Sequence, residues 1–164
     1  MPVPRHGLPS ISCVLPCRNE ARNLELLLPR LAKVLSRISE HFEVIIVDDG
    51  SADDTTKVLA QWSTRSGFRV IELSRNFGKE AALSAGLNAA RGDVVITMDT
   101  DLQHEPELIP TLLQKWRQGY VTRRMRCAAH VRTKACSNAW VRACSTRPWP
   151  RAGSSFPPMP VIFA

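Results

Sequence analysis

What the sequence lacks narrows the class of protein first. No apolar run among its 164 residues approaches the ~20 residues that a membrane-spanning helix needs. The first ten residues, Met1 to Ser10, also lack the apolar centre of a signal peptide. These absences predict a chain without a transmembrane segment that stays in the cytoplasm.

Paired cysteines are lacking as well. The count of five is odd, and no two cysteines form a C-x-x-C pair: Cys13, Cys17, Cys127, Cys136 and Cys144. Neither a disulfide framework nor a zinc site follows from such spacing. A reducing, cytosolic compartment fits this usage best.

Acidic side chains are missing from the last quarter of the chain. Residues 1–120 hold 14 Lys or Arg and all 15 Asp and Glu, whereas residues 121–164 hold eight Lys or Arg and no acid. The net charge of +7 therefore belongs to the last quarter. One interpretation of that quarter is a basic tail for anionic lipid or nucleic acid.

Between Ile11 and about Gln118, short apolar runs alternate with segments of helical periodicity. The runs predict strands at 11–15, 44–47, 68–73 and 94–98. The periodic segments predict helices at 24–38, 79–90 and 105–116, and a further helix that follows Ser51 and buries Val58, Leu59 and Trp62 on one face. Pro29 should kink the first helix or mark a later start. Ser51 to Asp54 reads as a capping box for the second helix. The alternation predicts an α/β fold with a parallel sheet flanked by helices.

A polar cluster follows each of the four predicted strands. The clusters occupy residues 16–20, 48–51, 74–80 and 99–103. Because ligands of open α/β sheets bind at the carboxyl ends of the strands, all four clusters should reach one rim. This coincidence is the strongest physical argument for a binding site.

The last cluster contains two carboxylates two positions apart, Asp99 and Asp101. Such groups repel each other unless a cation lies between them. Oxygen ligands suit Mg²⁺ or Mn²⁺, and the carbonyl of Gln103 could add another. The alternative is that this D-x-D only caps the helix that begins near Glu105.

The second cluster, Asp48-Asp49-Gly50-Ser51, also has two interpretations. A turn with a helix cap explains Gly50 and Ser51. The turn and cap would need only one acid. The second aspartate therefore favours the interpretation that this cluster offers a hydrogen-bond acceptor to a base or a ribose hydroxyl. Neither interpretation excludes the other.

In the third cluster, Gly78 and Lys79 stand at a predicted helix start, where backbone amides favour an anion. An ordinary glycine loop with an exposed lysine explains them equally well. The cluster is not a Walker A loop, and the G-x-G-x-x-G fingerprint of dehydrogenases is absent. The histidines His6, His41, His104 and His130 are isolated and read as surface or packing residues.

Four motifs in this order resemble family 2 inverting glycosyltransferases. They are V-L-P-C-R-N-E, I-I-V-D-D-G-S, S-R-N-F-G-K-E-A-A-L and M-D-T-D-L-Q-H-E-P-E. The branch that they resemble most contains dolichol-phosphate mannosyltransferases and undecaprenyl-phosphate glycosyltransferases. The resemblance covers roughly Ser10 to Tyr120. It implies a GT-A-type Rossmann-like fold, a nucleoside-diphosphate sugar donor and inverting transfer to a polyprenyl-phosphate at the cytoplasmic face of a membrane.

The resemblance also implies roles for individual residues. The ligands of a divalent metal, Mg²⁺ or Mn²⁺, would be Asp99, Asp101 and Gln103. The residues in contact with the nucleoside would be Pro16, Asn19, Glu20, Asp48 and Asp49. Lys79 would lie near the phosphates of the donor. No catalytic residue is assigned, because the acid that the family carries on the acceptor side is not found in this sequence.

Beyond Tyr120 the resemblance stops, so the chain divides into an N-terminal extension (1–10), a nucleotide-sugar-binding domain (11–120) and a basic tail (121–164). Read one base out of frame, parts of the tail can encode segments like the family's continuation. We therefore interpret the tail as a shifted reading frame. It should be irregular or disordered and contribute no fifth strand, leaving an incomplete sheet with an unpaired edge. We also expect a truncated fragment without detectable transfer to polyprenyl-phosphate.

Two other functions fit parts of the sequence. The chain could be a non-catalytic nucleotide-sugar-binding module whose basic tail docks on lipid or nucleic acid. A nucleotidyltransferase would need a glycine- and arginine-rich pyrophosphate loop after the first strand, and residues 16–20 are not such a loop. The preferred hypothesis is a glycosyltransferase that has no nucleic-acid partner.

Overall fold

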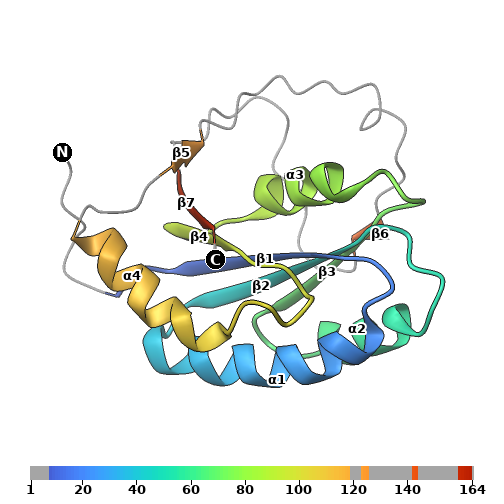
Figure 1. Cartoon of the computed structure of the whole chain (residues 1–164), viewed down its shortest axis with the longest axis horizontal. Helices are drawn as coiled ribbons and strands as arrows, with labels where there is room; N and C mark the ends of the chain where they lie inside the picture. The colour runs from blue at the N-terminus through green and yellow to red at the C-terminus, as the bar shows by residue number, and fades with distance from the viewer. Residues whose placement is uncertain (1–7, 119–122, 126–141, 144–158, 164) are drawn as a thin grey trace.

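The computed structural model describes residues 8–118, 123–125, 142–143 and 159–163. A single sheet forms its centre (Figure 1). Its four middle strands are parallel and lie in the order β4-β1-β2-β3. They are β1 (Ile11–Cys17), β2 (Phe42–Asp48), β3 (Phe68–Glu72) and β4 (Val94–Thr97). The prediction of a parallel α/β sheet is confirmed, and each predicted strand overlaps an observed one.

Helices cover both faces of this sheet. One face carries α1 (Ala21–Ile38), α2 (Thr55–Ser63) and α4 (Ile109–Arg117), which a short 3-10 helix, η1 (Pro106–Leu108), precedes. The other face carries α3 (Lys79–Ala89) (Figure 1). Pro29 lies inside α1, so it does not mark a later helix start. Among the described residues, no helix has the length and apolar character needed to cross a membrane.

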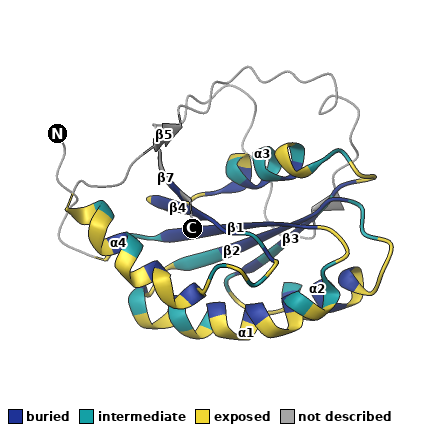
Figure 2. Cartoon of the chain, in the orientation of Figure 1, coloured by how far each residue is buried: buried dark blue, intermediate teal, exposed yellow. Residues whose placement is uncertain are grey.

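Two apolar cores hold these layers together. The larger core joins the sheet to α1, α2 and α4, and five leucines of α1 are buried in it. The smaller core joins the other face of the sheet to α3. Buried residues therefore line both faces of the strands, while the outer surfaces of the helices are exposed (Figure 2). Burial on both faces explains why the strands read as continuous apolar runs.

The described parts of the last quarter correct the prediction of an unpaired sheet edge. β7 (Met159–Phe163) pairs parallel with β4, and its Ile162 is fully buried in the larger core. β5 (Arg123–Met125) pairs antiparallel with β7, and β6 (Arg142–Ala143) pairs antiparallel with β3. The expectation that residues 121–164 add no strand is therefore wrong. The expected irregularity of the rest of the tail, with Trp140 and Trp149, falls outside the described residues.

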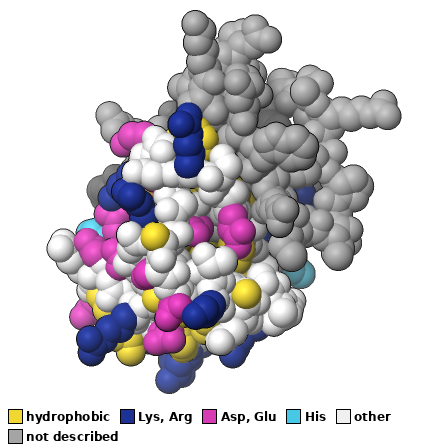
Figure 3. Space-filling view, turned by 90° about the vertical axis from the view of Figure 1, so that its right-hand side faces the viewer, with side chains coloured by type: hydrophobic (Ala, Val, Ile, Leu, Met, Phe, Trp, Pro, Cys, Tyr) yellow, Lys and Arg dark blue, Asp and Glu magenta, His cyan; other side chains and the backbone are white. Residues whose placement is uncertain are grey.

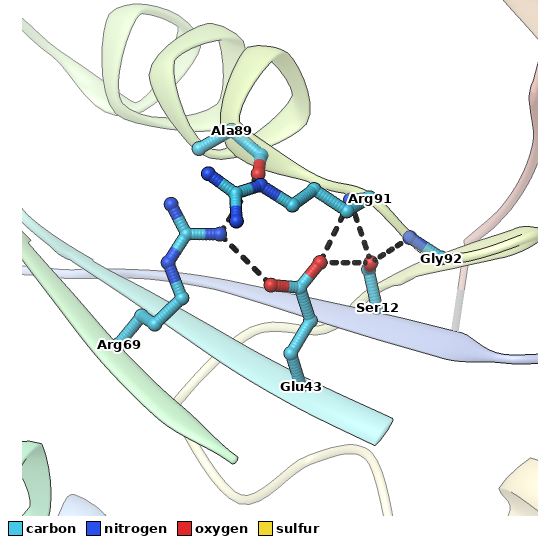
Figure 4. A network of polar contacts seen from close by, with 6 residues as sticks. All are labelled: Ser12, Glu43, Arg69, Ala89, Arg91 and Gly92. Atoms are coloured by element: carbon cyan, nitrogen blue, oxygen red, sulfur yellow. Dashed lines mark hydrogen bonds and ion pairs between the residues drawn. The ribbon is translucent and has the colours of Figure 1, made fainter. Parts of the chain in front are cut away.

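A polar network fixes the amino-terminal edge of the sheet, opposite the ends at which the predicted site residues stand (Figure 4). The Glu43 carboxylate accepts hydrogen bonds from the Arg69 guanidinium (2.8 Å), the Ser12 hydroxyl (2.6 Å) and the Arg91 backbone N–H (2.7 Å). The Ser12 oxygen also accepts from the Gly92 N–H at 2.7 Å. The network thereby ties the connection between α3 and β4 to the starts of β1 and β2.

A second contact at this edge joins the starts of β1 and β4. The backbone N–H and the hydroxyl of Ser10 both donate to Asp93 Oδ2, at 3.0 and 2.7 Å, and the Asp93 N–H donates to Ser10 Oγ at 2.9 Å. Donation from the Ser10 hydroxyl, and then from its N–H, holds the pKa of the Asp93 carboxyl below its usual value of 3.8. The charged form of Asp93 is therefore the form that the fold stabilises.

This pKa shift predicts a pH-dependent contribution to stability. Because the pKa is lower in the folded state, the contribution is complete above the usual pKa and is lost as the pH falls through the folded value. The difference in unfolding free energy between wild type and Asp93→Asn, measured by urea denaturation, should shrink from about pH 5 to about pH 2. A difference that stays constant over that range would show that the Asp93 charge does not contribute.

Candidate functional site

A cavity of about 430 Å³ opens at the carboxyl ends of the parallel strands. It lies on the rim that the four polar clusters predict. Its walls come from the end of β1, the start of α3 and the loops that follow β1 to β4: Pro16, Cys17, Arg18, Glu20, Asp49, Asn76, Gly78, Lys79, Ala82, Asp99, Thr100 and Asp101. Both acidic and basic side chains are exposed on the side of the molecule to which these strands point (Figure 3).

Six of the nine predicted site residues line this cavity: Pro16, Glu20, Asp49, Lys79, Asp99 and Asp101. The other three, Asn19, Asp48 and Gln103, are not among its lining residues. Gly78, which the sequence places at a helix start that favours an anion, also lines it, and so do Cys17, Arg18, Asn76, Ala82 and Thr100, which have no predicted role. All but Ala82 belong to the polar clusters that follow the strands. Their position after a strand is the sequence feature that could have identified them as cavity residues.

Asn19 joins the loop after β1 to the loop after β2. Its backbone N–H donates to the Ser51 hydroxyl oxygen at 2.9 Å, and its Oδ1 accepts from the Ala52 N–H at 2.8 Å. The backbone of Asn19 has a φ of 55°, a conformation that asparagine tolerates better than most residues. Asn19 thus shapes the cavity by holding two of its loops together.

Asp48 and Ser51 form the turn after β2. The Ser51 N–H donates to Asp48 Oδ1 at 3.1 Å, and the Ser51 hydroxyl donates to the same oxygen. The predicted capping box is therefore wrong. The N-cap of α2 is Asp54, which makes no side-chain cap bond, and Ser51 lies three residues before it with its hydroxyl engaged by Asp48 and Asn19.

Asp49 anchors the loop that follows β3. Asp49 is only 4% exposed, and its two carboxylate oxygens accept hydrogen bonds from the backbone N–H groups of Phe77 (2.7 Å) and Gly78 (2.9 Å). Gly78 is the N-cap of α3. A carboxylate has about four lone-pair sites, so each oxygen can accept a further bond on the cavity side. Asp49 thus fixes the start of α3 and still presents acceptors to the cavity.

Close packing of two loops surrounds this anchor. Gly50 has a φ of +68°, and a Cβ atom there would lie 2.7 Å from the backbone carbonyl carbon of Arg75 and from the backbone nitrogen of Asn76. The turn after β2 therefore rests directly on the loop after β3. Only glycine satisfies both the positive φ and this close approach.

Lys79, Asp99 and Asp101 form a group of charged side chains that line the cavity. Lys79 begins α3, and its Nζ lies 2.7 Å from Asp99 Oδ2. Asp101 Oδ1 accepts from the Gln103 backbone N–H at 3.0 Å. The N-cap of η1 is Glu105, which makes no side-chain cap bond. The structure therefore gives no support to the alternative that the D-x-D caps the following helix.

The chemistry of these donors can be compared with the needs of a divalent cation. No group of three or more His, Cys, Asp or Glu side chains that could hold a metal occurs in the described part of the chain. Asp99 and Asp101 offer hard carboxylate oxygens on one cavity wall. Mg²⁺ commonly binds through one or two carboxylates together with waters and substrate phosphates. The pair fits an ion that a phosphate ligand completes and does not fit a cage made by protein alone.

Cys17 contributes an uncharged side chain to the cavity wall. Burial, and then the neighbouring acids beginning with Asp48, raise the pKa of the Cys17 thiol far above its usual value. The thiol therefore stays protonated at neutral pH and is a poor nucleophile. Its place in the cavity is consistent with packing against a ligand.

Comparison with known families gives a match over most of the chain. The family model described as "Glycosyl transferase family 2" matches residues 12–145. The matched range includes the described cavity and extends past the boundary at residue 120 that the motifs suggest.

Proteins similar in sequence to this chain are also glycosyltransferases. An uncharacterized glycosyltransferase of Synechocystis sp. is 48% identical over 121 residues, which cover 71% of this chain and 38% of that protein. An undecaprenyl-phosphate 4-deoxy-4-formamido-L-arabinose transferase of Pseudomonas savastanoi pv. phaseolicola is 40% identical over 134 residues, 80% of this chain and 38% of that protein. The chain thus spans about two fifths of the length of these relatives.

Solved structures with the same fold include enzymes with bound nucleotides. A mannosyltransferase of Pyrobaculum calidifontis, in complex with GDP-Man and Mn²⁺, has a TM-score of 0.52 and 27% identity over 57% of this chain and 28% of that one. Glucosyl-3-phosphoglycerate synthase of Mycobacterium tuberculosis, in complex with Mn²⁺, UDP and glucosyl-3-phosphoglycerate, has a TM-score of 0.54 and 29% identity over 66% of this chain and 39% of that one. GT-A-like enzymes therefore share the described fold.

Proposed function

Because the chain belongs to glycosyl transferase family 2, we propose that its strand-end cavity binds a nucleoside-diphosphate sugar together with Mg²⁺ or Mn²⁺. The observation that carries the proposal is the convergence of Glu20, Asp49, Lys79, Asp99 and Asp101 on one cavity of about 430 Å³. A volume of this order is typical of small-molecule sites.

The side chains that line the cavity suit the different parts of such a donor. Asp49 and Glu20 present carboxylate acceptors, which suit the N–H groups of a base and the hydroxyls of a ribose. Lys79 supplies a positive charge for the diphosphate, and Asp99 with Asp101 would hold the divalent cation. When bound, that cation would neutralise the charge that develops on the leaving diphosphate.

Asn19, Asp48 and Gln103 act in this proposal through the loops. Asn19 ties the loop that carries Glu20 to the turn after β2, and Asp48 closes the turn that carries Asp49. The backbone N–H of Gln103 orients Asp101, while its side chain remains a proposed metal ligand. The residues predicted from the resemblance thus divide into those facing the cavity and those supporting it.

The acceptor that we propose is a polyprenyl-phosphate at the cytoplasmic face of a membrane. Support comes from relatives about 40% identical to this chain that are undecaprenyl-phosphate 4-deoxy-4-formamido-L-arabinose transferases. The chain covers 38% or less of these proteins, so transfer itself is proposed for the family's complete domain.

Calorimetry on metal and donor binding tests the proposal. Wild type should bind GDP-mannose or UDP-glucose in the presence of Mn²⁺, and Asp99→Ala/Asp101→Ala should bind at least about tenfold more weakly, which is about 1.4 kcal/mol. Glu107→Ala serves as the matched control, because Glu107 is a half-exposed acid in a 2.8 Å ion pair with Arg30 outside the cavity. Equal binding by wild type and the double variant, or binding that a chelator leaves unchanged, would contradict the metal assignment.

A further inference from the structure

The ion pair between Lys79 and Asp99 joins two loops of the cavity. The Lys79 ammonium lies 2.7 Å from Asp99 Oδ2, although the residues stand at the start of α3 and after β4. Both residues line the cavity, and Asp101 stands on the same wall. Lys79 thus already places one positive charge on a carboxylate that the proposed function assigns to a metal.

This ion pair is easy to exchange. Its side chains are 63% and 37% exposed, and exposed pairs of this kind are weak because water and salt screen them. A divalent cation carries twice the charge of an ammonium and attracts the same oxygen more strongly. The lysine is a point charge on a flexible stem, so its ammonium can move without a change in the backbone.

We propose that Lys79 and the divalent cation compete for Asp99, and that the Lys79 ammonium transfers to the donor diphosphate when the cation binds. The inference rests on the proposed function, since it uses the same cavity and the same donor. It assigns Lys79 two opposite effects. Lys79 opposes binding of the cation alone, and it supports binding of the cation together with a diphosphate.

The summed charge of the three side chains explains the two effects of Lys79. Asp99, Asp101 and Lys79 together carry a net charge of about −1 at neutral pH. A divalent cation changes the sign of this sum, and the displaced ammonium is then repelled until a diphosphate supplies negative charge. Lys79 therefore couples the two ligands, and by linkage each must strengthen binding of the other by the same factor. A cavity built this way takes up the metal and the nucleotide together.

The test measures Mn²⁺ binding directly, by electron paramagnetic resonance of the free ion, with and without GDP or UDP. Lys79→Gln should bind Mn²⁺ about two- to fivefold more tightly than wild type when no nucleotide is present. With nucleotide this advantage should vanish or reverse, so the coupling factor should fall. Lys79→Arg keeps the charge and should behave as wild type does.

The matched control is Lys57→Gln, which removes a lysine from a 2.6 Å pair with Asp54 whose side chains are 79% and 72% exposed. Lys57 is outside the cavity, so this variant should bind Mn²⁺ as wild type does. Circular dichroism of each variant verifies that all of them fold.

The outcomes separate this inference from the proposed function. Equal or weaker Mn²⁺ binding by Lys79→Gln without nucleotide overturns the competition, as does the absence of Mn²⁺ binding in every variant. Tighter Mn²⁺ binding by Lys79→Gln, combined with no binding of GDP or UDP by any variant, supports competition at Asp99 and contradicts the proposed donor site. Tighter Mn²⁺ binding with an unchanged coupling factor overturns the transfer of the ammonium to the diphosphate.

Discussion

Replacement of Asp49 by alanine is expected to lower the free energy of unfolding by about 2–4 kcal/mol and to abolish measurable nucleotide binding. The carboxylate is almost completely buried, and it accepts hydrogen bonds from the Phe77 and Gly78 N–H groups. A hydrogen bond to a charged acceptor contributes about 1.5–3 kcal/mol, and of the two donors only the Gly78 N–H keeps another acceptor, Asn76 Oδ1 at 3.0 Å. The start of α3, which carries Lys79, loses its anchor at the same time.

Urea denaturation and calorimetry with GDP or UDP check this expectation. Asp49→Asn keeps one acceptor oxygen and replaces the other with a donor, so its stability should lie between those of wild type and Asp49→Ala. Asp54→Ala removes an exposed acid at the N-cap of α2, where no side-chain cap bond exists, and should leave binding unchanged. If Asp49→Ala unfolds within about 0.5 kcal/mol of wild type, as ordinary surface variants do, the anchoring role is wrong.

A second large effect is expected at Gly50. Alanine there must adopt a φ of +68° and place its Cβ 2.7 Å from backbone atoms of Arg75 and Asn76. The left-handed backbone costs about 1–2 kcal/mol for a residue with a side chain. Forcing an extra carbon into packed structure costs about 1–3 kcal/mol more. Gly50→Ala should therefore lose about 2–5 kcal/mol of stability and displace the loop that carries Asn76.

Gly67 provides a matched comparison far from the cavity. Its φ is +83°, and an added Cβ would lie 3.2 Å from the Phe42 ring and 3.3 Å from the Phe42 backbone oxygen, a milder approach than the 2.7 Å at Gly50. Gly67→Ala should therefore lose only the backbone part, about 1–2 kcal/mol, and should bind GDP or UDP as wild type does. Equal loss of stability in both variants, with binding retained in Gly50→Ala, would show that the contact between the two loops does not shape the cavity.

The elements from Ile11 to Arg117 could be predicted because local patterns determine them. Their strands are buried on both faces, so they read as apolar runs, and α1 shows a clear leucine stripe. β7 could not be predicted in this way. It is five residues long and contains Pro160, a residue that normally argues against an inner strand. Its place follows from pairing with β4, more than 60 positions earlier in the chain.

The position of the cavity at the carboxyl ends of the strands could be predicted from the sequence. Which residues line the cavity and which ones support its loops could not. Asp48 and Asp49 are adjacent in sequence, yet only Asp49 lines the cavity. The partners of Asp49 stand 28 and 29 residues away, so no local pattern reveals them. The same limit explains the failed capping box, because the Ser51 hydroxyl meets Asn19, 32 positions away.

The strand order also predicts the order in which the strands pair when the chain refolds. β2 pairs with β1 and with β3 across short connections, whereas Ile11 of β1 meets Val94 of β4 across most of the domain. Closing a longer loop loses more chain entropy, and contacts distant in sequence form slowly. We therefore expect β1, β2 and β3 to assemble first and β4 to join them later. The part of the cavity that contains Asp49 would then form before the part that contains Asp99 and Asp101.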